Sequence, residues 1–156
     1  MSETVHKPSI FVIIPPPIWA LLFFLIGWGA GAALKLDRVF QSTAAGVALV
    51  IAGFAFAAWG RLTFARVGAE IQPASAKNSV LVTNGPFHFT RNPMYLGILI
   101  IMIGLSLVVG TVAALISIIV YVLWANFISI PYEEQKMERQ FGEDYRAYKK
   151  SVRRWI

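Results

Sequence analysis

Residues 93–130, PMYLGILIIMIGLSLVVGTVAALISIIVYVLWANFISI, contain no charged side chain and are almost entirely apolar. A membrane helix needs about 20 predominantly apolar residues to cross about 30 Å of hydrocarbon. The stretch is long enough for two such helices, and Gly110-Thr111 near its centre supplies a turn signal. We therefore predict a tight hairpin of two membrane helices, at 93–109 and 111–130.

The rest of the chain has the composition of a membrane protein. Hydrophobic residues make up 57% of the 156 residues and charged residues only 14%, against about 45–50% and about 25% in soluble domains. Two more apolar segments, 18–36 and 43–64, precede the hairpin. The sequence thus predicts an all-α fold, one domain over 1–156 with four transmembrane helices. Because the chain has no cysteine, disulfides and thiolate metal sites are excluded, and we expect no metal site.

Lysine and arginine positions predict the orientation of this bundle. Of the fourteen Lys and Arg residues, only Lys35 and Arg38 lie between the first two segments. The other twelve precede the first segment, flank or separate the second and third, or follow the fourth. Because basic residues favour the cytoplasmic side, we expect both termini and a loop at 66–92 to be cytoplasmic. The net charge of +6 beside apolar runs favours anionic lipid headgroups over nucleic acid as a partner.

The first apolar segment has an alternative interpretation as a cleaved signal peptide, since the small residues at 29–33 within it offer a cleavage site. Only Lys7 precedes it among basic residues and the apolar run is long, which favours a membrane helix.

The C-terminal region has a different pattern. Apolar side chains recur there at spacings of three and four, which places them on one helical face: Met137, Phe141, Tyr145, Tyr148, Val152 and Trp155. Most basic residues of this C-terminal region lie outside the apolar face. The pattern predicts an amphipathic cytoplasmic helix over 131–155, with a kink at Gly142 because glycine weakens a helix.

Two polar clusters lie at the predicted cytoplasmic ends of the hairpin. In the first, Asn92 suits a helix N-cap and Pro93 the first helical position. The free N–H groups of that helix start, with Arg91 beside them, favour an anionic ligand group. The plain alternative is a capped helix whose arginine meets lipid phosphate.

The second cluster is the acidic pair Glu133-Glu134, which follows the fourth segment. At about 1.5 Å per residue, both clusters lie about 27–30 Å from the hairpin turn, so they are expected to be level. Placing two carboxylates at a membrane border costs free energy unless they are paired with cations or take part in binding or catalysis. The alternative is a water-facing helix start, where acidic residues suit the helix dipole.

Five segments form an ordered set of motifs: LVTNGPF at 81–87, RNPMYLG at 91–97, the acidic pair, FGEDYRAY at 141–148 and VRRW at 152–155. Together they resemble the isoprenylcysteine carboxyl methyltransferase and phospholipid methyltransferase superfamily. The resemblance covers about residue 69 to the C-terminus. It implies a small integral membrane enzyme that uses S-adenosylmethionine. Its cofactor pocket would be formed on the cytoplasmic side by the last two membrane helices and the C-terminal helix.

The resemblance also implies a set of site residues. The expected cofactor-binding residues are Arg91, Asn92, Pro93, Tyr95, Gly97, Glu133 and Glu134, and Glu133 and Tyr95 are candidate catalytic residues by location. Asn92 stands where the family motif has histidine, so acid–base work is not expected at that position. Ser129 stands where the prenylcysteine enzymes have an arginine that engages a substrate carboxylate. This weakens carboxyl methylation, while amine, thiol and carboxyl groups stay open as acceptors.

The resemblance leaves two rival functions. Sterol-type membrane reductases that use NADPH share the Arg-x-Pro-x-Tyr-x-Gly pattern, but they are usually larger. A non-enzymatic membrane bundle is the other alternative, although a channel would need polar residues along its helices. The short chain and the acidic pair favour methyl transfer to a lipid-like or small hydrophobic acceptor that enters from the bilayer.

Overall fold

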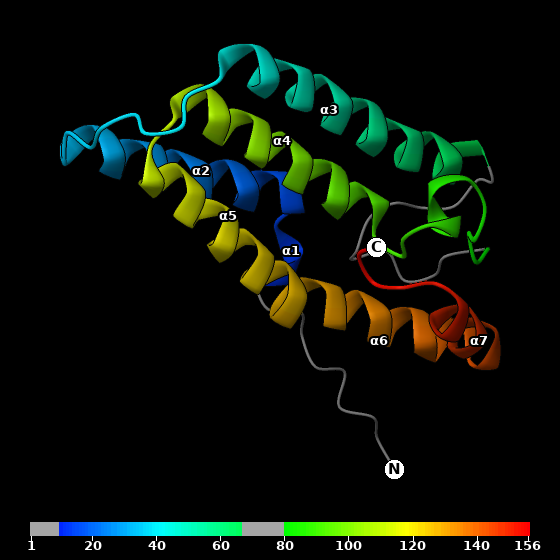
Figure 1. Cartoon of the computed structure of the whole chain (residues 1–156). Helices are drawn as coiled ribbons and strands as arrows, with labels where there is room; N and C mark the ends of the chain where they lie inside the picture. The colour runs from blue at the N-terminus through cyan, green and yellow to red at the C-terminus, as the bar shows by residue number, and fades with distance from the viewer. Residues whose placement is uncertain (1–9, 67–79) are drawn as a thin grey trace.

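The structure is a computed structural model that describes residues 10–66 and 80–156. All regular elements in these ranges are helical, and no strand occurs in them (Figure 1). The elements are α1 (Ile10–Ile13), α2 (Pro16–Ala33), α3 (Thr43–Arg66), the 3₁₀ turn η1 (Gly85–His88), α4 (Pro93–Val109), α5 (Val112–Trp124), the π-helix η2 (Ala125–Ser129), α6 (Ile130–Phe141) and α7 (Glu143–Ser151).

Within the described residues, three helical runs are long and apolar enough to cross a membrane: Pro16–Ala33, Thr43–Arg66 and the continuous run Val112–Phe141. The 17-residue helix α4 is apolar but shorter. The prediction for α4 is confirmed at both ends. The first helix begins and ends earlier than predicted. Proline fits its first turn, and the positive φ of Lys35 lies just beyond its end.

The predicted hairpin turn is confirmed. Helix α4 ends at Gly110, whose φ of +79° lies in the left-handed region that glycine adopts at little cost. The Gly110 N–H donates to the Ser106 carbonyl at 2.7 Å. Thr111 then begins α5 in an extended conformation, so α4 and α5 are joined without an intervening loop.

The prediction that the fourth helix ends at residue 130 is wrong, because α5, η2 and α6 form one continuous helix. Pro131 has no N–H, and its ring would clash with a carbonyl four residues earlier in a regular α-helix. The π-helix avoids this conflict, since the Ile130 N–H bonds to the Ala125 carbonyl five residues back. The acidic pair therefore lies inside a helix and not at a new helix start.

The C-terminal region forms two helices, α6 and α7, where the sequence predicts one kinked helix. They meet at Gly142, whose φ is +53°. Tyr145, Tyr148 and Val152 are buried in a cluster with three partners from other elements, namely Phe64, Val82 and Phe87. The apolar face of this region thus packs on the protein.

Helices α3 and α4 pack closely through glycines spaced seven residues apart. A Cβ atom on Gly53 would lie 2.7 Å from the Gly97 carbonyl oxygen, and one on Gly97 would lie 2.7 Å from the Ala57 Cβ. Gly46 and Gly104 meet in the same way one repeat further along. Small residues of this kind let two membrane helices approach through their backbones.

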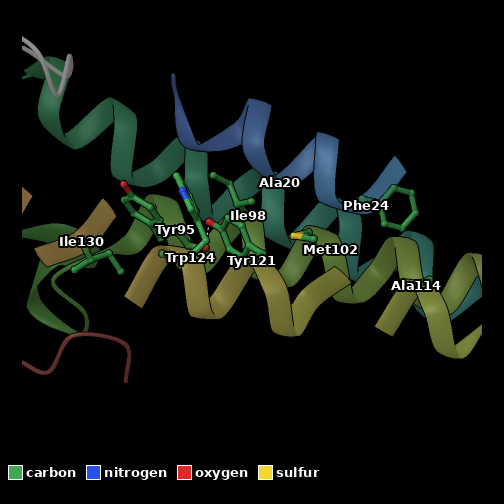
Figure 2. Packing of buried hydrophobic residues seen from close by; sticks show 10 residues of the cluster. Ala20, Phe24, Tyr95, Ile98, Met102, Ala114, Tyr121, Trp124 and Ile130 are labelled. Atoms are coloured by element: carbon green, nitrogen blue, oxygen red, sulfur yellow. Dashed lines mark hydrogen bonds between the residues drawn. The ribbon is translucent and has the colours of Figure 1, made fainter. Parts of the chain in front are cut away.

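Helix α2 packs chiefly along α5, opposite the α3–α4 pair (Figure 1). The main core lies where α2, α4 and α5 meet (Figure 2). Its large buried side chains are Phe24, Tyr95, Ile98, Met102, Tyr121, Trp124 and Ile130. Tyr95 therefore connects the core to the polar end of α4.

Candidate functional site

A cavity of about 1110 Å³ lies between α2, α3 and α4 and the C-terminal helices α6 and α7. Its apolar part is lined by α2, α3 and α4, with Phe24, Phe54 and Leu105 among the lining residues. Its polar part is lined by the end of α3, the start of α4, and by α6 and α7. The polar lining residues are Arg61, Arg91, Asn92, Tyr95, Glu133, Glu134, Lys136, Tyr145 and Tyr148. One cavity thus joins the two polar clusters to an apolar interior.

Tyr95, Glu133 and Ser129 form a hydrogen-bonded group on this cavity. The Tyr95 hydroxyl donates to Glu133 Oε1 at 2.6 Å and lies 2.7 Å from Ser129 Oγ. Tyr95 and Ser129 are both buried. The predicted level placement of the two clusters is confirmed by this contact. Only one carboxylate oxygen of Glu133 takes part in these bonds.

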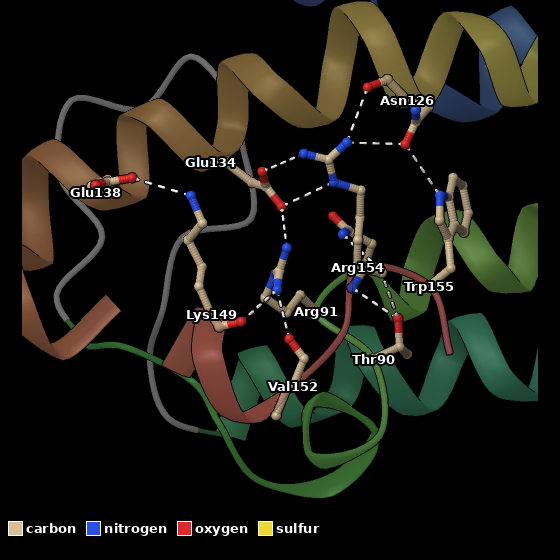
Figure 3. Close-up of polar contacts among 10 residues, drawn as sticks. Thr90, Arg91, Asn126, Glu134, Glu138, Lys149, Val152, Arg154 and Trp155 are labelled. Atoms are coloured by element: carbon tan, nitrogen blue, oxygen red, sulfur yellow. Dashed lines mark hydrogen bonds and ion pairs between the residues drawn. The ribbon is translucent and has the colours of Figure 1, made fainter. Parts of the chain in front are cut away.

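Glu134, the neighbour of Glu133, joins two arginines (Figure 3). Its Oε1 lies 2.8 Å from Arg91 Nη2, and its Oε2 lies 2.6 Å from Arg154 Nη2. The side chains of Arg91 and Glu134 are only 10% and 9% exposed. The two guanidinium groups offset the desolvation cost of burying this carboxylate. The network therefore fixes α4, α6 and the C-terminal tail to one another.

Arg91 also binds the end of α7. Its Nη1 donates to the carbonyls of Lys149 and Val152, at 3.0 and 2.5 Å. An arginine at this position satisfies carbonyl groups that a helix C-terminus leaves free. Arg91 Nε is buried and has no hydrogen-bond partner in the part of the chain that the structure describes.

The C-terminal tail runs across the start of α4 (Figures 1 and 3). The Arg91 N–H donates to the Arg153 carbonyl at 3.0 Å. The Arg154 carbonyl accepts from Thr90 Oγ1 at 3.1 Å and from Asn92 Nδ2 at 3.0 Å. Asn92 therefore occupies the N-cap position predicted for it, but its side chain binds the tail instead of capping the helix.

Arg154 also reaches the π-helix η2. Its Nη1 donates to the carbonyl and the side-chain Oδ1 of Asn126, at 3.2 and 3.0 Å. The Ile130 N–H already bonds to Ala125, and Pro131 has no N–H to offer the Asn126 carbonyl. Arg154 supplies the donor that the helix lacks at this point. Trp155 Nε1 adds a 3.4 Å contact to Asn126 Oδ1.

Sequence reasoning predicted neither Asn126 and Arg154 as contacts of this network nor the hydrogen bond between Ser129 and Tyr95. The separation of Arg154 from Glu134 and Asn126 follows no helical period. The one available signal was Pro131 inside an apolar helix, because a proline there leaves a carbonyl to be satisfied.

The other predicted site residues have packing roles in the structure. Pro93 is buried and lies in the first turn of α4, where Gly60 of α3 packs against it. Gly97 lies on the α3–α4 contact and provides the close approach to Gly53. Pro93 lines the cavity, whereas Gly97 does not line it and contacts α3 instead.

Tyr148 fixes the loop that follows the undescribed segment. Its hydroxyl donates to the Phe87 carbonyl at 2.6 Å. Burial raises the pKa of the Tyr148 phenol to about 12, so it stays protonated and remains a donor at neutral pH. Of the loop predicted at 66–92, residues 67–79 lie outside the described part of the chain.

The fold and the site together define a small helical membrane protein with a cavity whose polar and apolar ends adjoin. The chain matches the phospholipid methyltransferase family over residues 41–144 and belongs to it. This family lies within the superfamily that the sequence motifs resemble, and it implies a membrane methyltransferase.

A curated relative from Haemophilus influenzae carries no functional description. It is an uncharacterized protein that is 40% identical over 63 residues, which is 40% of this chain and the whole length of the relative. No solved structure matches the chain.

Proposed function

We propose that this protein transfers a methyl group from S-adenosylmethionine to a lipid-like or small hydrophobic acceptor at the cytoplasmic membrane face. The observation that carries the proposal is the contact between Tyr95 and Glu133 on a cavity that also has an apolar end. A cavity of this size accommodates a ligand larger than a typical drug-sized molecule. Family membership supports methyl transfer as the reaction.

The donor set in the cavity fits the cofactor. The carboxylate oxygen of Glu133 that makes no described hydrogen bond is an acceptor for ribose hydroxyls or an ammonium group. Arg91 Nε is a buried donor without a partner among the described residues, suited to a hydroxyl or carboxylate oxygen. We propose that Glu133, Tyr95, Asn92 and Arg91 line the cofactor site directly. Glu134, Pro93 and Gly97 hold the elements that carry them.

Bound S-adenosylmethionine supplies an electrophilic methyl group attached to a sulfonium sulfur. The protein's main contribution is to orient the acceptor in a cavity that excludes bulk water. Tyr95 and Ser129 fix the rotamer of Glu133 through consecutive hydrogen bonds. If the acceptor atom is an ammonium or a protonated thiol, Glu133 is placed to receive its proton.

The proposal includes a membrane arrangement. Helices α2, α3, α4 and α5 are the four spans, and both termini are cytoplasmic. The charged half of α6, together with α7, then forms an amphipathic cytoplasmic unit packed on the bundle. This arrangement puts the polar end of the cavity at the cytoplasmic side and the apolar end within the bilayer, where an amphiphilic acceptor enters.

The test is transfer of labelled methyl from S-adenosylmethionine to membrane lipids by the protein in nanodiscs. We expect the wild type to label a lipid fraction, and both Glu133→Gln and Tyr95→Phe to lower the rate at least about tenfold, as expected for loss of a positioned acid or base. Glu138→Gln is the matched control, because Glu138 lies on the same helix and does not line the cavity. Equal rates in all variants would contradict the assignment of Glu133 and Tyr95.

A further inference from the structure

Three cationic side chains line the cavity within the described residues, namely Arg61, Arg91 and Lys136. Arg91 has both terminal nitrogens engaged by Glu134 and by two carbonyls. Lys136 makes interactions of its own and lies near Glu133. Arg61 differs from both, because no described hydrogen bond or ion pair engages its side chain.

The position of Arg61 on α3 is unusual for a charge without a partner. The helix has no other charged residue until Arg66 at its last position, and no acidic residue at all. A charged side chain within or beside a membrane span is costly and is generally associated with binding, transport or pairing. Arg61 is exposed at the cavity, one turn beyond the apolar lining residues Ala57 and Ala58.

We propose that Arg61 binds the anionic group, a phosphate or a carboxylate, of the amphiphilic acceptor. Its guanidinium presents several donors that match the oxygens of such a group. An acceptor whose apolar chain lies between Phe54 and Leu105 places its headgroup near the Arg61 end of the cavity. This inference rests on the proposed function, which it deepens by naming the charge class of the acceptor.

The same anionic chemistry has a second source, the carboxylate of the cofactor. The two sources are separated by probes that carry only one of them. Dodecyl phosphate has the chain and the phosphate without the cofactor. S-adenosylhomocysteine has the carboxylate, whereas 5′-methylthioadenosine has the nucleoside and sulfur without it.

The experiment measures equilibrium binding of these probes and of dodecanol to the purified full-length protein in maltoside detergent. Loss of a charge-assisted contact is expected to weaken dodecyl phosphate binding about tenfold in Arg61→Gln. Arg61→Lys retains most of that affinity, and dodecanol binds all proteins alike. The matched control is Arg66→Gln, which removes a charge from the same helix at a residue that does not line the cavity.

Three outcomes overturn the proposal. Equal losses in Arg61→Gln and Arg66→Gln mean that only the surface charge matters. Unchanged dodecyl phosphate binding in Arg61→Gln means that Arg61 does not bind the anionic group of the acceptor. If Arg61→Gln weakens only S-adenosylhomocysteine, while 5′-methylthioadenosine binds normally, Arg61 belongs to the cofactor site instead. Because binding is measured without turnover, absence of methyl transfer is a separate result that bears on the proposed function alone.

Discussion

Glu133 and Glu134 are adjacent on α6, yet their surroundings differ. Glu133 bonds to Tyr95 on the cavity, and Glu134 is held by Arg91 and Arg154. Successive helical residues point about 100° apart, because a turn takes 3.6 residues. The pair therefore places one carboxylate beside Tyr95 and the other, which also lines the cavity, in the network that anchors the C-terminal tail.

The Arg154 side chain is expected to contribute to stability. Replacement of Arg154 by Gln removes donors to Glu134 and to the Asn126 carbonyl, which lowers the free energy of unfolding by about 1–3 kcal/mol. The midpoint of thermal unfolding in detergent measures this loss. Arg153→Gln is the control, because the exposed Arg153 side chain makes no described contact.

A double variant tests whether Arg154 stabilises the protein through its hydrogen bonds to Asn126 of the π-helix. Arg154 and Asn126 share two hydrogen bonds, so Arg154→Gln and Asn126→Ala together should destabilise less than the sum of the two single changes. Full additivity, or an equal effect of Arg153→Gln, would contradict the role given to Arg154.

At the scale of elements, the α3–α4 contact sets the shape of the cavity. Its glycines allow the two backbones to approach closely, and Tyr95 is carried on the same helix two residues before Gly97. A displacement of α4 relative to α3 therefore also moves Tyr95 relative to Glu133.

We expect Gly97→Ala to impair both stability and cofactor binding, because the added methyl group would lie 2.7–2.9 Å from Ala57 and Gly53 atoms. Overpacking of this kind costs about 1–3 kcal/mol. Gly29→Ala is the matched control, since a Cβ there meets nothing within 4 Å. Thermal unfolding and S-adenosylhomocysteine binding are the two measurements, and an unaffected Gly97→Ala protein would refute the packing argument.

The sequence predicted those features that depend on local chemistry. Gly110 marks the hairpin turn, the helices near 43–64 and 93–109 follow from unbroken apolar runs, and Gly142 marks a break in the C-terminal helical pattern, which was predicted as a kink and is the junction of two helices. The level placement of Tyr95 and Glu133 followed from counting residues on either side of the turn.

The features that the sequence did not predict depend on contacts between distant residues. The sequence predicts that the fourth apolar helix ends at residue 130, just before Pro131, whereas the π-helix and Arg154 together accommodate this proline inside a continuous helix. The use of Asn92 to bind the tail depends on the path of residues 152–155, which no periodicity reveals. The close packing at Gly97 likewise becomes visible only when Gly53 lies against it.

At the scale of the whole molecule, the distribution of basic residues predicts one orientation in the membrane. Because the chain has no cysteine, a single introduced cysteine reports the side on which it lies. We expect Ala147→Cys in α7 to react with an impermeant maleimide only from the cytoplasmic side. Asp37→Cys, in the exposed connection between α2 and α3, should react only from the opposite side. The reverse pattern, or reaction of both from one side, would overturn the four-span topology.

The central claim is that the cavity lined by α2, α3, α4, α6 and α7 binds S-adenosylmethionine at its polar end. Calorimetric titration of S-adenosylmethionine, S-adenosylhomocysteine and NADPH into the purified protein, in detergent and in lipid nanodiscs, tests it most directly. We predict saturable binding of the first two ligands, weakened by Glu133→Gln, and no binding of NADPH. Binding of NADPH alone would indicate a reductase, and absence of all binding in both media would contradict the proposed cofactor site.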